Sequence, residues 1–117
     1  MKIIVYGIPN CDQVKKARAW LNDHALPFDF HDFKKAGVSR SLIEAWLTQI
    51  PLDVLLNKKG TTWRGLPELR KAAITDADSA INLMLELPSL IKRPVVTTSE
   101  SIHAGFSDPL YQQLFKN

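Results

Sequence analysis

The stretch YGIPNCDQVKKARAWL, Tyr6 to Leu21, contains the single cysteine of the chain, Cys11. The apolar, β-branched run at residues 2–6 precedes it and predicts a short buried strand that ends at Gly7. Beyond Cys11, the segment from Asp12 to His24 carries apolar residues at helical spacing, namely Val14, Ala17, Trp20 and Leu21. The sequence therefore predicts that Cys11 lies where a strand turns into a helix.

A thiol at this junction faces the first backbone N–H groups of the helix, which have no partner within the helix and carry partial positive charge. Lys15 lies one turn later on the same side, and its positive charge would also stabilise the thiolate of Cys11. The carboxylate of Asp12 would destabilise the thiolate unless it points to solvent. We therefore expect the pKa of Cys11 to lie below its usual range and the thiol to be nucleophilic. Two alternatives stay open: an inert thiol fitted into a turn, and a Cys-His hydrolase with His31 or His103.

The elements that follow continue an α/β pattern. Residues 27–33, PFDFHDF, predict a second strand, so the chain begins with a right-handed β-α-β unit. Residues 34 to about 91 are predicted to be mostly helical, with one helix capped by Ser39 and another by Thr75 or Asp76. This segment is too interrupted to predict an independent domain, and we interpret it as an insertion.

The C-terminal part returns to strands. Residues 93–98 predict a short strand with Pro94 at its entrance, and residues 101–106 predict its hairpin partner. Asp108 is expected to cap a last helix with Pro109 at its first position. The order is thus β-α-β, then helices, then β-β-α.

Composition narrows the class of protein. The 117 residues suffice for one domain, predicted over 1–117, and no apolar run is long enough to cross a bilayer. A lone cysteine excludes an intramolecular disulfide and points to the reducing cytoplasm. One cysteine and three scattered histidines show no metal-ligand spacing, so no metal is expected. The net charge is only +3 and the lysine pairs are dispersed, so we expect no nucleic-acid partner.

Two arginines are candidates for binding an anion. Arg64 lies in the polar stretch NKKGTTWRG, which predicts a loop, and its planar guanidinium suits an oxyanion or a carboxylate. Arg93 precedes Pro94, and an X-Pro bond at the start of a strand is a place where cis peptides occur. Taken alone, Arg64 is better explained as an exposed loop arginine, and the alternative explanation of Arg93 and Pro94 is simple strand initiation at an edge of the sheet.

Three stretches of this chain, YGIPNCDQVKKARAWL, NKKGTTWRGL and LIKRPVV, together resemble the arsenate reductase (ArsC)-like family, which includes the Spx regulators. The similarity covers nearly the whole chain and is strongest to the small YffB-type branch. It implies a thioredoxin-like α/β fold, in which β-α-β and β-β-α segments form a mixed four-stranded sheet with a helical insertion at about 34–91. This agrees with the element order above.

The resemblance also implies a site. The catalytic cysteine of the family matches Cys11, its cis-proline matches Pro94, and its two anion-binding arginines match Arg64 and Arg93. With the residues that flank the thiol, the predicted substrate-binding and anion-binding set is Asn10, Lys15, Arg64, Arg93 and Pro94.

The resemblance implies a cytoplasmic, glutathione-dependent thiol reductase. We expect it to be a monomer that holds no bound cofactor and does not associate with a membrane. The Cys11 thiolate would attack an oxidised sulfur or an oxyanion, and glutathione, with glutaredoxin as a further candidate partner, would complete the reduction. An external thiol is required because the chain has no second cysteine.

This chain departs from the motifs of the family at two places, and each place bears on one alternative function. Glutathione-coupled arsenate reductases of the family carry a further arginine after the strand, but Gly105 stands near that place and residues 95–117 contain no arginine. Spx regulators, which bind RNA polymerase, often have a Cys-x-x-Cys at the first helix, but here Asp12, Gln13 and Val14 follow Cys11. Arsenate reduction and a non-catalytic regulatory role are therefore retained as alternatives.

Overall fold

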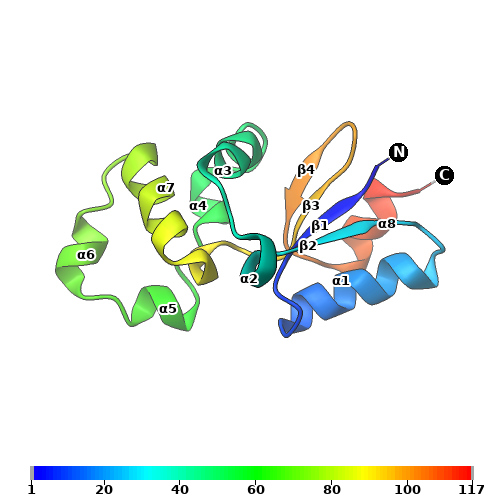
Figure 1. Ribbon diagram of the computed structural model, residues 1–117, viewed down its shortest axis with the longest axis horizontal. Helices are drawn as coiled ribbons and strands as arrows, with labels where there is room; N and C mark the ends of the chain where they lie inside the picture. Colours follow the sequence, from blue (N-terminus) through cyan, green and yellow to red (C-terminus); the bar gives the residue numbers. More distant parts are fainter. Residues whose placement is uncertain (1, 117) are drawn as a thin grey trace. The chain divides into compact units, whose positions relative to one another are not determined.

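The computed structural model describes residues 2–116, which form two compact units. One unit combines the chain up to Gly37 with the chain from Arg93 onward, and the other is Val38–Lys92 (Figure 1). The helical insertion predicted at about 34–91 thus corresponds to the second unit. That the whole chain behaves as a single domain stays a prediction.

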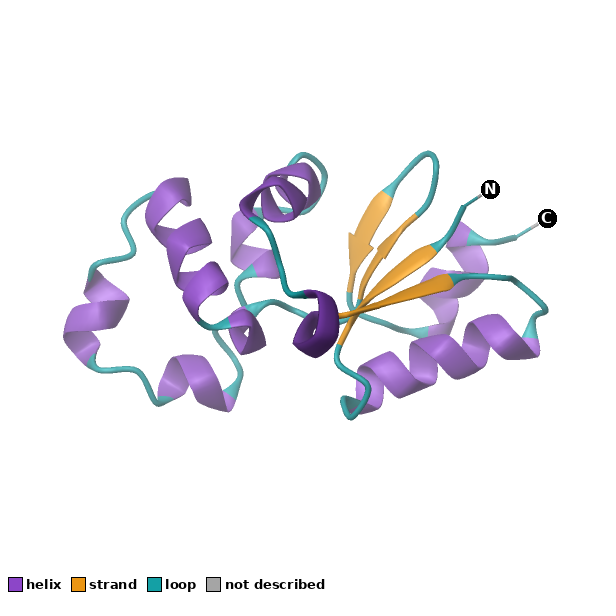
Figure 2. Cartoon of the chain, viewed as in Figure 1, coloured by secondary structure: helices purple, strands orange, loops and turns teal. Residues whose placement is uncertain are grey.

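The first unit is built on a mixed four-stranded sheet of order β2-β1-β3-β4 (Figure 2). Its strands are β1 (Ile4–Gly7), β2 (Asp29–Asp32), β3 (Val95–Thr97) and β4 (Ile102–Ala104). β1 pairs with β2 in parallel and with β3 in antiparallel register, and β3 pairs with β4 in antiparallel register. This is the thioredoxin-like arrangement predicted from the sequence, and it is confirmed.

Two helices, α1 (Asp12–Asp23) and α8 (Asp108–Leu114), pack on one face of this sheet, as Figure 1 shows. A further short helix, α2 (Phe33–Ala36), follows β2 directly. The core between the helices and the sheet consists of Ile3, Val5, Ala17, Trp20, Leu21, Val96, Tyr111 and Phe115. The alternation of strand residues explains this set, because Val5 and Val96 are paired across β1 and β3 and share a face.

The second unit is helical. Its elements are α3 (Arg40–Leu47), α4 (Leu52–Leu55), α5 (Thr61–Arg64), α6 (Glu68–Ala72), α7 (Ala77–Glu86) and a 3₁₀ turn, η1 (Pro88–Leu90). Its buried side chains include Ile43, Trp46, Leu55, Ile81, Met84 and Leu90. A single antiparallel bridge between Leu56 and Ile91 ties the end of α4 to the segment that leaves the unit.

Two helix starts in this unit follow the sequence prediction. The Ser39 side chain accepts a hydrogen bond from the amide of Leu42 and caps α3. Of the two candidates for the start of α7, Asp76 is the cap and Thr75 is not. The Asp76 carboxylate accepts from the amide of Ser79 at 2.8 Å, and the Ser79 hydroxyl in turn accepts from the amide of Asp76, which completes a capping box.

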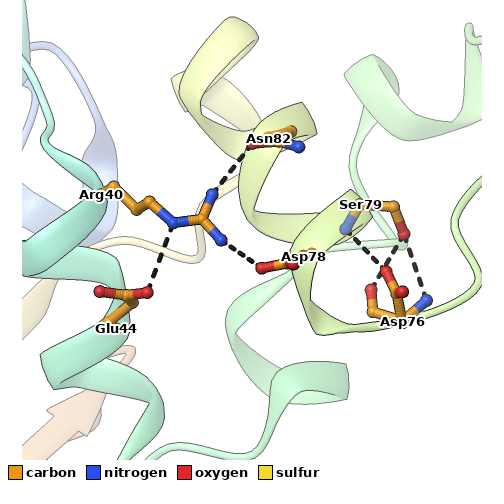
Figure 3. A network of polar contacts seen from close by, with 6 residues as sticks. All are labelled: Arg40, Glu44, Asp76, Asp78, Ser79 and Asn82. Carbon is orange, nitrogen blue, oxygen red and sulfur yellow. Dashed lines mark hydrogen bonds and ion pairs between the residues drawn. The ribbon is translucent and has the colours of Figure 1, made fainter.

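A surface network joins α3 to α7 (Figure 3). The Arg40 guanidinium donates to Asp78 and, at 3.0 Å, to Asn82 on α7, and it lies 3.3 Å from the carboxylate of Glu44 on α3. All of these groups are substantially exposed, so solvent weakens each pair. The network therefore contributes little to the stability of the unit.

The last helix begins one residue earlier than predicted. Ser107, not Asp108, is the cap: its hydroxyl accepts from the amide of Leu110 at 3.2 Å. Asp108 is instead the first helical residue, where its carboxylate accepts from the indole N–H of Trp20 on α1. The prediction was wrong because serine and aspartate are both good caps, and the carboxylate of Asp108 instead accepts a hydrogen bond from Trp20, a residue far away in the sequence.

Two other boundaries also differ. The strand predicted over 27–33 spans only Asp29–Asp32, because the Asp32 side chain accepts from the amide of Lys34 and starts α2. Part of the stretch predicted as a loop, Thr61–Arg64, forms the short helix α5, so that prediction was wrong. No capping side chain marks the start of α5, since Gly60 occupies the cap position.

The junction between β1 and α1 depends on a close approach at Gly7. A Cβ atom placed on Gly7 would lie 2.6 Å from Cγ2 of Val14, which is fully buried on α1. We expect Gly7→Ala to destabilise the fold by about 1–3 kcal/mol through overpacking. Urea unfolding of the single variant, of Val14→Ala, and of the double variant checks this.

The double variant should lose less free energy of unfolding than the two single variants lose together, because removing the valine methyls makes room for the new Cβ. Additive losses would contradict this explanation of Gly7.

Candidate active site

The topology of the sheet brings the thiol and Arg93 to the same edge. β1 and β3 are antiparallel, with Tyr6 opposite Val95, so the end of β1 and the start of β3 coincide. Cys11 follows the end of β1, and Arg93 and Pro94 directly precede β3. These residues meet although more than 80 positions of sequence separate them.

Cys11 is the N-cap residue of α1, with extended backbone angles of φ −90° and ψ 129°. Its amide donates to the carbonyl of Ile8 at 3.3 Å, and its carbonyl accepts from the amide of Lys15 at 2.9 Å, which closes the first turn of the helix. The thiol makes no capping hydrogen bond of ordinary geometry, and the residue is partly exposed. The sulfur is thus held at the helix start and is open to reagents.

The pKa of Cys11 lies below the usual value for a thiol. Partial burial is the largest single effect and raises the pKa, but the groups around the sulfur together outweigh it. The amide of Val14, the side chain of Arg93 and the amide of Gln13 all favour the thiolate as hydrogen-bond donors, and the charge of Arg93 adds to them. The low pKa predicted from the helix start is therefore supported.

The cation responsible differs from the one predicted to lower this pKa. Lys15 is exposed and is not among the groups that perturb Cys11, so that part of the prediction was wrong. Solvent screens an ammonium group that extends away from the helix. Arg93 supplies the positive charge instead. Asp12 in the first turn is exposed, in keeping with an outward-pointing carboxylate.

The Arg93–Pro94 peptide bond is cis, and Pro94 is buried. The carbonyl of Pro94 accepts a hydrogen bond from the amide of Gly105 at 2.8 Å. Gly105 has a φ of 84°, a left-handed conformation that favours glycine over residues with a Cβ atom. An arginine at this position would therefore be strained. This backbone conformation could not be predicted from the sequence.

The remaining predicted residues lie in different surroundings. Asn10 is exposed in the turn before Cys11. Arg64 belongs to α5 of the second unit, where its Nε donates to the carbonyl of Gly60 at 3.4 Å, and its role toward a substrate stays a prediction. His31 and His103, the candidate hydrolase bases, are not among the groups that perturb the pKa of Cys11.

The described residues also bear on two other kinds of site. Among residues 2–116, no group of three or more His, Cys, Asp or Glu side chains is arranged to hold a metal ion. Within the same range, no helix has both the length and the apolar character needed to cross a membrane.

With this geometry established, comparison with known proteins identifies the family. The family model described as "ArsC family" matches residues 6–114. The chain belongs to the ArsC family. The matched range includes Cys11, Arg64 and Arg93, so all three motifs that indicated the family in the sequence lie within it.

Individual ArsC-family relatives cover almost the whole chain. An uncharacterized protein of Haemophilus influenzae is 42% identical over 97% of this chain and 98% of its own length. The solved structure of a YFFB protein is 41% identical, covers 95% of this chain and 96% of its own, and superposes with a TM-score of 0.89. A global transcriptional regulator, Spx 1 of Lactococcus lactis, is 26% identical over 91% of this chain and 83% of its own length.

The electrostatics of Cys11 can be tested by its rate of alkylation with iodoacetamide as a function of pH. Because only the thiolate reacts, the rate rises through the pKa of Cys11, and a lowered pKa moves the midpoint to lower pH. Arg93→Ala should move this midpoint upward, since a donor and a charge are both lost.

Lys15→Ala is the matched control for a cation on the helix itself, and it should leave the midpoint of alkylation nearly unchanged. A larger shift for Lys15→Ala than for Arg93→Ala would contradict the assignment of the charge to Arg93.

Proposed function

We propose that this member of the ArsC family is a glutathione-dependent thiol reductase that uses Cys11 as its nucleophile. The observation that carries the proposal is the environment of the Cys11 sulfur, which favours the thiolate through two helix amides and the Arg93 side chain. A thiolate is the form of cysteine that attacks disulfides, so this environment suits thiol exchange.

The proposed substrate is a mixed disulfide between glutathione and another thiol. The Cys11 thiolate attacks the glutathione sulfur, a new Cys11–glutathione disulfide forms, and the other thiol leaves as a thiolate that takes a proton from water. A second glutathione thiolate then attacks the glutathione sulfur held on Cys11. This step releases glutathione disulfide and regenerates the Cys11 thiolate, so electrons balance without a second cysteine in the chain.

Arg93 has a further role in this proposal. Its guanidinium stabilises the thiolate before attack, and once the disulfide has formed on Cys11 we propose that it binds a carboxylate of glutathione. Asn10, Lys15, Arg64 and Pro94 are proposed to complete binding, as the family resemblance implies. Because the second thiol is external, the reaction requires a reducing compartment, and we propose the cytoplasm.

The direct test is turnover of a glutathionylated peptide with excess glutathione. Cys11→Ser should reduce the rate to that of the uncatalysed exchange, because the hydroxyl is not ionised at neutral pH. Arg93→Ala should lower kcat/KM by about 10–100-fold, the range expected when a hydrogen bond to a charged group is lost.

Circular dichroism of both variants serves as the control for folding. Full activity in Cys11→Ser would overturn the proposal, whereas full activity in Arg93→Ala would overturn only the role of the arginine.

Arsenate reduction is the first alternative, and the conformation of Gly105 argues against it. The fold there favours glycine, so the additional arginine of the glutathione-coupled arsenate reductases has no counterpart at this position. With arsenate, glutathione and glutaredoxin as substrates, we expect no arsenite above the level formed by Cys11→Ser. Arsenite formation that depends on Cys11 would favour the alternative.

A regulatory role is the second candidate, and the similarity to Spx 1 of Lactococcus lactis favours it. In that case the chain would bind RNA polymerase, and the interaction would survive Cys11→Ser. Retention on immobilised RNA polymerase, compared between the two forms of the chain, distinguishes this role from catalysis.

A further inference from the structure

The parallel pairing of β1 with β2 places α2 at the same edge of the sheet as the thiol. Gly7 at the end of β1 lies opposite Asp32 at the end of β2. The chain continues from Gly7 into the turn that carries Cys11, and from Asp32 directly into α2. Figure 1 shows both segments at this end of the sheet. The strand order β2-β1-β3 therefore puts the thiol between α2 on one side and Arg93 on the other.

The backbone of α2 is fixed at both ends, although the helix has only one turn. The ring of Phe33 is buried at its start, where the Asp32 carboxylate accepts from the amide of Lys34 at 2.9 Å. At its end, the Nε2–H of His31 on β2 donates to the carbonyl of Gly37 at 2.8 Å. The lysines that follow Phe33 are thus presented from a defined position beside the end of β1.

The side chains of Lys34 and Lys35 are exposed and available to a ligand. Among residues 2–116, neither ammonium group forms an ion pair or a hydrogen bond. The segments 8–15, 32–37 and 93–94, which make up this edge, carry a net charge of +2. Their charged residues are Lys15, Lys34, Lys35 and Arg93 against Asp12 and Asp32. Cations beyond Arg93 are therefore present for a second negative group.

The width of this edge matches the length of glutathione. Neighbouring strands lie about 4.8 Å apart, so β2 and β3, on either side of β1, are about 10 Å apart. An extended chain of three residues spans about 10 Å as well. Glutathione carries its sulfur on the middle residue and a carboxylate at each end. With its sulfur on Cys11, its two ends can reach α2 and Arg93 at the same time.

We propose that Lys34 and Lys35 bind one terminal carboxylate of glutathione while Arg93 binds the other. The inference rests on the proposed function, because it names the residues that hold glutathione during that reaction. It also makes the two lysines specificity-determining. A disulfide of free cysteine brings a carboxylate on a single residue, which is too short to span the three strands, so it gains nothing from α2.

The test measures the fraction of the chain that carries a Cys11–glutathione disulfide at equilibrium, by intact mass spectrometry in buffers of glutathione and glutathione disulfide. In this exchange the Cys11 thiolate attacks glutathione disulfide and one glutathione thiolate leaves, so electrons balance. Lys34→Ala with Lys35→Ala should lower the equilibrium constant by about three- to tenfold, the range for two exposed ion pairs. Salt at about 1 M should remove most of the difference.

The matched control is Lys2→Ala with Lys116→Ala, which removes the same charge from the first unit. Both lysines are exposed, Lys2 precedes β1 at the opposite edge of the sheet, and Lys116 follows α8. The control should leave the equilibrium constant nearly unchanged. The thermal midpoint of each double variant checks that folding is retained.

Two analogues of glutathione, each with one terminal carboxylate replaced by a carboxamide, separate direct binding from a general effect of charge. The loss caused by the α2 lysine variant should disappear with one analogue and persist with the other. No loss, an equal loss with both analogues, or an equal loss in the control would overturn the proposal. Dependence of the same carboxylate on Lys15 instead of the α2 pair, shown by Lys15→Ala, would also overturn it.

Failure of this inference is distinguishable from failure of the proposed function. If the α2 variant behaves like the unaltered chain while both turn over a glutathionylated peptide, only the role of Lys34 and Lys35 is overturned. If Cys11 forms no disulfide with glutathione in any buffer, the proposed function is overturned with it.

Discussion

The antiparallel pairing of β1 with β3 is the constraint on which the site depends. It places the start of α1 beside the segment that enters β3, so that the amides of Gln13 and Val14 and the side chain of Arg93 all act on one sulfur. Partial burial of the thiol, the largest single effect, opposes them by raising the pKa. A thiolate is favoured only because several donors converge, and a shift in the pairing of the two strands would remove Arg93 from the set.

The same edge of the sheet also limits which substrates the first unit suits. Pro94 is buried and its carbonyl is engaged by Gly105, so the backbone next to the thiol is fixed. One guanidinium acts on the sulfur, and residue 105 has a backbone conformation that favours glycine, so we propose a disulfide of glutathione rather than a tetrahedral dianion as the substrate. The chain's membership of the ArsC family is shown by the family model, whereas the chemistry that we propose rests on these local features.

Much of this could be predicted from the sequence, because local signals were strong. The β-branched run before Gly7, the helical spacing after Cys11 and the caps at Ser39 and Asp76 all fix elements through short-range interactions. Two predictions failed where a distant partner decided the outcome. Trp20 engages Asp108 and leaves Ser107 to cap α8, and Arg93 rather than the neighbouring Lys15 acts on the thiol. Such contacts depend on the tertiary fold, and no spacing along the chain reveals them.

The most direct measurement of the central claim is the titration of Cys11 by NMR, with ¹³C at its β-carbon, in the folded chain and in the same chain unfolded in urea. Cys11 should titrate at lower pH in the folded chain, because the helix start and Arg93 act on the sulfur only when β1 and β3 are paired. A folded midpoint equal to or above the unfolded one would show that burial outweighs the donors and would contradict the account.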